Sequence, residues 1–205
     1  LSASLIERAG GEVVYMSGSS VSTAVHGRPD VGLTTMTEMV DRAREMVSAV
    51  DVPVFCDADT GYGNPINVVR TVEAFERAGV AGIHIEDQTF PKRNGDVKGV
   101  EVISLEEAVG KVEAAVDARD ERDPDFVIIA RTDVRRTAGG TIDDAIERAT
   151  AFAEAGADVV FVKVPESRAE AERVGREVDA RLLYPCSGTA MRLEPHELEA
   201  MGWDI

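Results

Sequence analysis

The sequence predicts an α/β protein, a (β/α)8 TIM-type barrel truncated at both ends. Short runs rich in Val, Ile and Phe alternate with amphipathic helical segments along the 205 residues, a pattern typical of parallel strands buried on both faces. Several expected helices end in Ala-Gly just before the next strand, where glycine can take the left-handed turn that ends a helix. No glycine-rich dinucleotide turn follows any strand, which favours a barrel over an open doubly wound sheet.

Six strands are expected along the chain, and each is a continuous apolar run: Glu12 to Met16, Val52 to Cys56, Gly82 to Ile85, Phe126 to Ala130, Asp158 to Val162 and Arg181 to Tyr184. Amphipathic helices are expected between them: Met36 to Val50, Asn67 to Ala78, Leu105 to Ala118, Ile142 to Ala155 and Ala169 to Val178. The start of the chain is expected to be helical, so that the first strand would precede Leu1. Another strand is expected to start at Trp203. Residues 1–205 are thus expected to be one barrel domain without its first strand and its C-terminal part.

Composition limits the partners that the protein can have. With 22 basic and 38 acidic residues, its formal net charge is −16, so nucleic acid and anionic membranes would repel it. The sequence contains no apolar run long enough to span a membrane and does not open on a basic-then-apolar leader, and its two cysteines are far apart. These features are typical of a cytoplasmic protein with reduced thiols. We therefore expect cytoplasmic localisation and a small-molecule substrate.

Acidic side chains gather at the expected carboxyl ends of neighbouring strands, which is where a barrel carries its active site. Asp57 and Asp59 follow the second expected strand and Glu86 follows the third. Three converging carboxylates repel one another unless a hard cation neutralises them, so they predict a site for Mg2+, with Mn2+ as a substitute. The alternative is that these acids cap the following helices or pair with Arg131 and Arg93.

An anion site is expected beside these acids. Ser17-Gly18-Ser19 follows the first expected strand and offers hydroxyl and amide donors to a carboxylate or an oxyanion. Arg131 follows the fourth expected strand and supplies a forked cation opposite those donors.

A polar stretch from Phe90 to Val100 is expected to act as a lid. It contains glycines that can serve as hinges, and it follows the third expected strand directly, so it would close over a bound anion. His84, in contrast, alternates inside that strand, which favours a packed side chain over a catalytic one.

Together these segments strongly resemble the isocitrate lyase/phosphoenolpyruvate mutase superfamily, essentially from Leu1 to Ile205. The motifs that carry the resemblance are Tyr15-Met16-Ser17-Gly18-Ser19, Gly27-Arg28-Pro29-Asp30, Cys56-Asp57-Ala58-Asp59-Thr60-Gly61-Tyr62-Gly63, Ile83-His84-Ile85-Glu86-Asp87-Gln88, Pro91-Lys92-Arg93 and Ile129-Ala130-Arg131-Thr132-Asp133. The resemblance implies a Mg2+-dependent barrel, usually a homodimer or homotetramer. Such a barrel acts on a substrate derived from a 2-oxo acid through an enolpyruvate-like oxyanion.

The resemblance also implies roles for individual residues. Positions matching Asp57, Asp59 and Glu86 surround the metal in that family, directly or through water. Substrate binding is expected at Ser17, Gly18, Ser19, Asp30 and Arg131. The expected catalytic residues are Arg131, which stabilises negative charge, and the lid residues Lys92 and Asn94.

The lid departs from the pattern of the family's lyases. Those lyases carry Lys-(Lys/Arg)-Cys-Gly-His, with the cysteine transferring a proton, whereas this chain has Lys92-Arg93-Asn94-Gly95-Asp96. Phosphoenolpyruvate mutases and phosphonopyruvate hydrolases also have asparagine in the lid. A glutamate common after the sixth strand aligns with Lys163, and an asparagine common after the seventh aligns with Pro185. Both changes weaken the case for isocitrate or methylisocitrate as the substrate.

Three functions therefore stay open. The first is a Mg2+-dependent lyase that cleaves a carbon–carbon bond, which Glu86-Asp87-Gln88 and the length of the lid favour. The second is a phosphoenolpyruvate mutase, phosphonopyruvate hydrolase or oxaloacetate decarboxylase-like activity, which Asn94 favours. The third is a non-catalytic family member that binds a dicarboxylate or a metal, which the missing cysteine, glutamate and asparagine favour.

Overall fold

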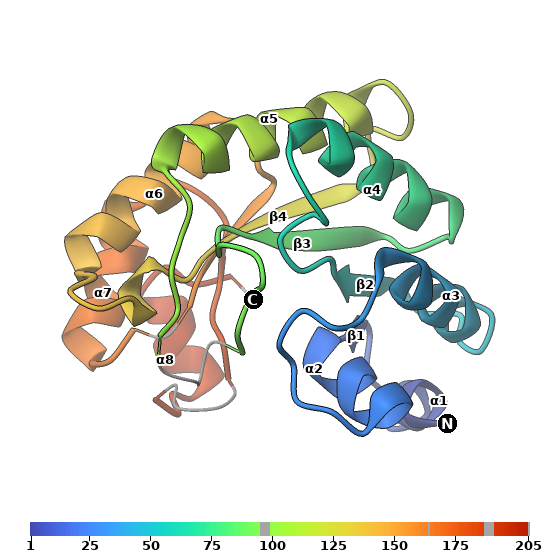
Figure 1. Ribbon diagram of the computed structural model, residues 1–205. Coiled ribbons are helices and arrows are strands. Elements are labelled where there is room, and N and C mark those ends of the chain that lie inside the picture. The colour runs from blue at the N-terminus through green and yellow to red at the C-terminus, as the bar shows by residue number, and fades with distance from the viewer. Residues whose placement is uncertain (95–98, 164, 187–190, 205) are drawn as a thin grey trace.

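The computed structural model describes residues 1–94, 99–163, 165–186 and 191–204. Its strands are all parallel and pair in chain order: β1 (Val14–Met16), β2 (Val54–Asp57), β3 (Gly82–Glu86), β4 (Val127–Thr132), β5 (Val159–Val162) and β6 (Leu182–Leu183). The strands curl into a half-barrel whose convex side is covered by helices (Figure 1). The predicted barrel architecture and all six expected strands are confirmed.

The helices alternate with the strands: α1 (Ser2–Arg8), α2 (Gly18–Val21), α3 (Met36–Val47), α4 (Pro65–Arg77), α5 (Leu105–Asp120), α6 (Ile142–Glu154), α7 (Arg168–Glu177) and α8 (Pro195–Ala200). A π-helical turn, Ser22–His26, extends α2, and a 3-10 turn, Val134–Arg136, follows β4. Within the described residues, no helix combines the length and the apolar character needed to cross a membrane.

Local sequence fixes where the outer helices begin. Asn64 caps α4 through its side-chain oxygen, which accepts the Asn67 N–H, and Pro65 occupies the first helical position, where its missing N–H costs nothing. Thr35 and Glu38 form the reciprocal capping box that starts α3. The helices α3 and α4 therefore start only after the segments that follow β1 and β2, and the last residues of these strands are left at the open end of the barrel.

The hydrophobic core fills the space between the sheet and the outer helices. Met39, Phe75, Ile83, Ile128 and Phe152 are fully buried there. Side chains alternate across a strand. The neighbours of Ile83 and Ile128 in their strands therefore point to the concave side of the sheet, and this side can carry polar groups.

Three features of the chain were not expected from the sequence. The donor segment Ser17-Gly18-Ser19 forms the cap and start of the helix α2, and the helix α8 forms near the C-terminus. Trp203 and Asp204 were expected to open a strand, but in the described residues they form none. Trp203 donates its Nε1–H to the carbonyl of Ala171 at 3.1 Å, and the Asp204 amide meets the carbonyl of Leu182 at 3.0 Å beside β6.

Candidate active site

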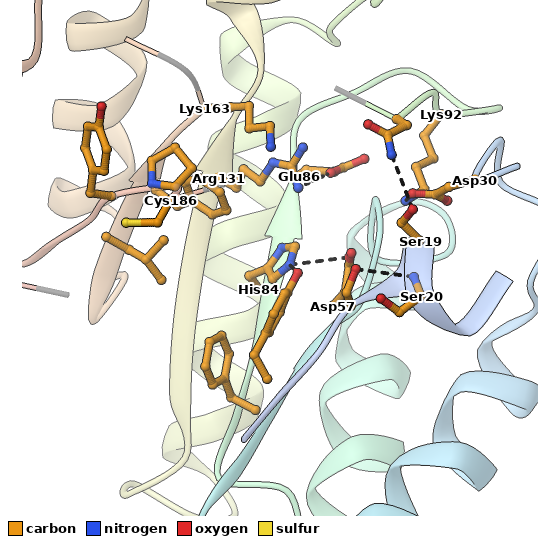
Figure 2. A pocket seen from close by; sticks show the side chains of 18 of the residues that line it. Ser19, Ser20, Asp30, Asp57, His84, Glu86, Lys92, Arg131, Lys163 and Cys186 are labelled. Atoms are coloured by element: carbon orange, nitrogen blue, oxygen red, sulfur yellow. Dashed lines mark hydrogen bonds and ion pairs between the residues drawn. The ribbon is translucent and has the colours of Figure 1, made fainter. Parts of the chain in front are cut away.

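A cavity of about 520 Å³ lies at the concave side of the sheet and receives side chains from all six strands. Most of the predicted site residues line it: Ser17, Ser19, Asp30, Asp57, Glu86, Lys92, Asn94 and Arg131. Figure 2 shows several of them facing one another across the cavity, with Asp57 and Lys92 on one side and Arg131 and Lys163 on the other. The fold thus brings together residues that are far apart in sequence.

Asp57 and Asp59 converge at the end of β2. The Asp57 carboxylate accepts the Asp59 N–H at 2.9 Å and the Gly18 N–H at 3.1 Å. A Cβ at Gly18 would lie 2.9 Å from Oδ2 of Asp57 and 3.1 Å from Oδ1 of Asp59, so the two carboxylates approach the same point. The predicted Gly18 amide donor is therefore engaged by Asp57.

The loop that carries Asp59 is held in an unusual backbone conformation. Asp59 and Tyr62 have positive φ values of 50° and 57°, which few non-glycine residues adopt. Gly61 has φ of 80°, and a Cβ there would come within 2.6 Å of the Val68 side chain on α4. Lys111 on α5 donates a hydrogen bond to the carbonyl of Thr60 at 3.1 Å and so helps to fix the loop.

Glu86 and Arg131 form the centre of the cavity wall. They are register partners on β3 and β4, and Nη1 of Arg131 lies 3.0 Å from Oε2 of Glu86. Arg131 also donates to Asp133 at 2.8 Å. The sequence offered ion pairing with Arg131 as the alternative to a metal site, and this ion pair confirms that alternative for Glu86. Neither oxygen of Glu86, however, accepts a hydrogen bond from the described residues, although both are buried.

Lys92 reaches from the lid into the acidic cluster. Its Nζ lies 2.9 Å from Oδ2 of Asp30 and 2.5 Å from Oδ1 of Asp59. The neighbouring Asn94 donates its backbone N–H to the Asp30 carbonyl at 3.0 Å and its side-chain amide to the Ser19 hydroxyl at 3.3 Å. The first half of the predicted lid is thus docked over the cavity, while Gly95 and Asp96 lie outside the described residues.

Burial and charge shift the pKa values of these acids in opposite directions. Burial raises the pKa of Glu86 well above its usual range, against the nearby charges of Arg131 and Lys92. Burial and the charge of Asp57 raise the pKa of Asp59 to about 7. Burial also opposes ionisation of Asp57, but His84, Lys92 and Arg131 outweigh it and hold the pKa of Asp57 below its ordinary value.

The donor set fits a hard divalent cation in charge and in chemistry. Two buried cations, Lys92 and Arg131, stand among five carboxylates, Asp30, Asp57, Asp59, Glu86 and Asp133. Ionisation of all five leaves three negative charges in surplus. A donor set made of carboxylate oxygens suits Mg2+. As they stand, no three His, Cys, Asp or Glu side chains of the described residues are arranged to hold a metal, so the metal-ligand set stays a prediction.

Tyr15 and His84 form a hydrogen-bonded pair on the cavity wall, and the His84 side chain is buried, as the sequence predicted for a packed residue. The Tyr15 hydroxyl lies 2.8 Å from Nε2 of His84, and that nitrogen lies 3.5 Å from Oδ1 of Asp57. Burial lowers the pKa of His84 to about 4, so the ring is neutral at pH 7. A register argument would have placed His84 beside Asp57, because these two residues are partners across β2 and β3.

Asp87 supports the site from behind and does not face the cavity. It accepts hydrogen bonds from the Thr132 hydroxyl at 2.7 Å and the Asp133 N–H at 2.9 Å, and it pairs with Arg148 of α6 at 3.0 Å. These contacts tie the ends of β3 and β4 to α6. Glu86 and Arg131 are therefore held by a rigid frame.

Comparison with known proteins identifies relatives of this chain. A family model described as phosphoenolpyruvate phosphomutase matches residues 1–205. The 2,3-dimethylmalate lyase of Eubacterium barkeri is 49% identical over 207 residues, which cover all of this chain and 70% of that protein.

Solved structures give the same picture. A crystal structure of 2,3-dimethylmalate lyase superposes with a TM-score of 0.92 at 37% identity, covering 99% of this chain and 68% of that one. A phosphonopyruvate hydrolase in complex with oxalate and Mg2+ superposes with a TM-score of 0.85 at 33% identity, covering 98% and 69%. The chain thus spans about 70% of the length of these relatives.

Proposed function

The chain belongs to the phosphoenolpyruvate phosphomutase family, within the isocitrate lyase/phosphoenolpyruvate mutase superfamily, and from this premise we propose that it is a Mg2+-dependent carbon–carbon lyase. Its substrate is a small carboxylate related to a 2-oxo acid. The observation that carries the proposal is the surplus of carboxylates around Lys92 and Arg131 at the open end of the barrel. That arrangement supports binding of a cation together with an anionic substrate.

Asp57, Asp59 and Glu86 would hold the Mg2+. When bound, the metal supplies a Lewis acid that stabilises negative charge on substrate oxygens. The Ser19 hydroxyl and the Asn94 amide, which already contact each other at 3.3 Å, are placed to bind the substrate carboxylate. Arg131 faces the same cavity with a fixed guanidinium and stabilises the oxyanion that develops as the bond breaks.

Proton transfer is assigned to the Tyr15–His84 pair. In carbon–carbon cleavage of a 2-hydroxy acid, the hydroxyl proton leaves, C2 becomes a carbonyl, and the electron pair of the broken bond passes to the departing carbon, which then takes up a proton. The neutral ring of His84 can accept or donate a proton through the Tyr15 hydroxyl at 2.8 Å. Asn94 cannot do so, because an amide does not titrate.

A second activity is favoured by one observation at the lid. Asn94 occupies the place over the cavity where a proton-transferring group would sit, and it donates a hydrogen bond there instead. A reaction that moves or hydrolyses a carbon–phosphorus bond, or that removes a carboxylate, makes use of such a donor. The oxalate-bound phosphonopyruvate hydrolase, with its TM-score of 0.85, supports this alternative.

The remaining features of the proposal follow from family membership. We propose that the protein is a single barrel domain, cytoplasmic, and assembled as a homodimer or homotetramer. Size-exclusion chromatography with light scattering tests the assembly, and a monomer would contradict it.

A turnover screen tests the function. The full-length protein is assayed with 2,3-dimethylmalate, 2-methylisocitrate, isocitrate, oxaloacetate and phosphonopyruvate, with Mg2+ and with EDTA, in the wild type and in Asp57→Ala. A lyase releases a 2-oxo acid that disappears with EDTA and in the variant, whereas release of phosphate from phosphonopyruvate supports the alternative. Full activity of Asp57→Ala would overturn the metal site. Oxalate binding that depends on Mg2+, without turnover of any substrate, would identify a non-catalytic member.

A further inference from the structure

Two buried side chains of the outer helices hold the loop that carries Asp59. Lys111 of α5 donates to the carbonyl of Thr60 at 3.1 Å, and the hydroxyl of Thr71 on α4 donates to the carbonyl of Gly61 at 3.0 Å. Figure 1 shows α4 and α5 side by side on the convex side of the sheet. Neither side chain is among those that line the cavity, so the loop is anchored from outside the site.

Lys111 is an unusual anchor because its charged group is buried. The residue is only 6% exposed, and its ammonium group is in ion-pair contact with no carboxylate of the described residues. Burial lowers the pKa of Lys111 below its usual range, against the more distant charges of Glu107 and Asp87. A buried ammonium group costs free energy unless it has partners. The contact that accounts for its position in the described structure is the hydrogen bond to Thr60.

The loop needs anchors because its backbone is strained on both sides of Thr60. Asp59 has a φ of 50° and Tyr62 a φ of 57°, and a non-glycine residue persists in this region only where the surrounding structure fixes it. This conformation directs the Asp59 carboxylate to the point beside Gly18 that the Asp57 carboxylate also approaches. A change to a negative φ would rotate the Cα–Cβ bond of Asp59 and move its carboxylate away from that point.

The two anchors differ in strength. Thr71 has a single hydroxyl proton, which it shares between the carbonyl of Gly61 at 3.0 Å and the carbonyl of Asn67 in its own helix at 2.9 Å. Lys111 has three N–H groups and a positive charge, and hydrogen bonds from a charged donor are stronger than those between neutral groups. Lys111 therefore holds the loop more firmly than Thr71 does.

We infer that Lys111 and Thr71 are positioning residues that set the affinity of the site for Mg2+. They act through Asp59, because they hold the loop in the conformation that keeps its carboxylate beside that of Asp57. The inference rests on the proposed function, in which Asp59 is a metal ligand. It places part of the control of metal binding on the outer helices α4 and α5, which do not reach the cavity with these side chains.

Calorimetric titration of the full-length protein with Mg2+ tests this inference. Lys111→Met keeps the length of the side chain and removes the charged donor, so it is expected to bind Mg2+ about 10-fold more weakly than the wild type. Lys111→Arg keeps a charged donor and is expected to bind Mg2+ within about threefold of the wild type. Thr71→Val removes only a shared neutral donor and is expected to bind Mg2+ about threefold more weakly.

Two comparisons separate positioning from a general loss of stability. Arg119 is a buried cation about two turns further along α5 that pairs with Asp158. Arg119→Met is therefore expected to lower the unfolding midpoint in urea and to leave the Mg2+ affinity unchanged. Asp59→Asn removes the carboxylate through which Lys111 acts and keeps a side chain that tolerates a positive φ. In the Asp59→Asn background, Lys111→Met is expected to cause no further loss of Mg2+ affinity.

The results that would overturn the inference are distinguishable from failure of the proposed function. If Lys111→Met binds Mg2+ as the wild type does, or weakens binding equally in the Asp59→Asn background, or has no more effect than Arg119→Met, Lys111 does not act through Asp59, and the proposed function stands. If Lys111→Met does not fold, Thr71→Val decides, and an unchanged Mg2+ affinity of that variant overturns the inference. If the wild type binds no Mg2+, the proposed function fails and the inference fails with it.

Discussion

Replacement of Asp57 by asparagine is expected to abolish stabilisation by Mg2+. The Asp57 carboxylate lies 2.9 Å from the Asp59 N–H and 3.1 Å from the Gly18 N–H, and it uses a different oxygen for each. An asparagine of the same size has one oxygen, so it turns an NH2 group toward one of these donors. This contact between two buried donor groups lowers the free energy of unfolding by about 1–3 kcal/mol. The removal of one of the surplus negative charges in the cavity offsets part of this loss.

The loss of stabilisation by Mg2+ can be measured separately from this effect on the metal-free protein. A ligand at a hundredfold excess over its Kd stabilises a protein by about 2.7 kcal/mol, which raises Tm by about 5–10 °C for a chain of this size. Thermal unfolding of the full-length wild type is therefore expected to show a rise of this order when Mg2+ replaces EDTA. Asp57→Asn is expected to show a rise of less than about 2 °C, because the carboxylate at the centre of the donor set is gone.

A surface carboxylate provides the control. Asp41 pairs with Arg44 on the exposed side of α3, so Asp41→Asn removes the same charge without touching the cavity, and it is expected to keep the wild-type response to Mg2+. If Asp57→Asn responds to Mg2+ as strongly as the wild type, Asp57 is not a metal ligand, and its role is limited to accepting the Gly18 and Asp59 N–H groups.

Two further substitutions test the packing around the acids. Gly18→Ala would place a Cβ 2.9 Å from Oδ2 of Asp57 and so displace that carboxylate. Calorimetry is therefore expected to show at least tenfold weaker Mg2+ binding. Binding equal to that of the wild type would contradict the close approach of Gly18 and Asp57. Arg148→Met leaves the buried carboxylate of Asp87 without its partner at 3.0 Å and is expected to lower the free energy of unfolding in urea by about 3–5 kcal/mol. The control Arg168→Met, on the exposed side of α7, is expected to leave the unfolding midpoint almost unchanged, and equal effects of the two arginine variants would argue against a role for Asp87 as a frame.

The strands were predictable because their signal is local. A run such as Gly82 to Ile85 is apolar apart from His84, and β3 (Gly82–Glu86) ends only one residue later. The helix α2 was missed because Gly18–Val21 has no apolar period, and its start depends on the Ser17 hydroxyl, which accepts the Ser20 N–H at 3.4 Å. Propensity gave no reason to expect a helix there.

The candidate site was predictable in its members but not in its pairings. The expected acids follow expected strand ends, so the position of each one follows from barrel geometry. Which acid meets which cation depends on contacts between distant segments, such as Lys92 with Asp30, 62 residues apart. Sequence reasoning therefore offered a metal site and ion pairing as alternatives, whereas the structure contains the ion pairs together with a surplus of carboxylates that would suit a metal.

The side chains that line the cavity limit which groups can move a proton. A substrate bound beside Asp57 would also meet Arg131 and His84, which line the same cavity. Arg131 stays charged and Asn94 does not titrate, whereas the Tyr15–His84 pair can exchange a proton. Cleavage of a carbon–carbon bond in a 2-hydroxy acid needs a base for the hydroxyl proton and a proton for the departing carbon, whereas a mutase that moves a phosphoryl group within one substrate needs neither. Loss of turnover in His84→Gln, with oxalate binding retained, would therefore argue against a mutase, and undiminished turnover would argue against proton transfer by His84.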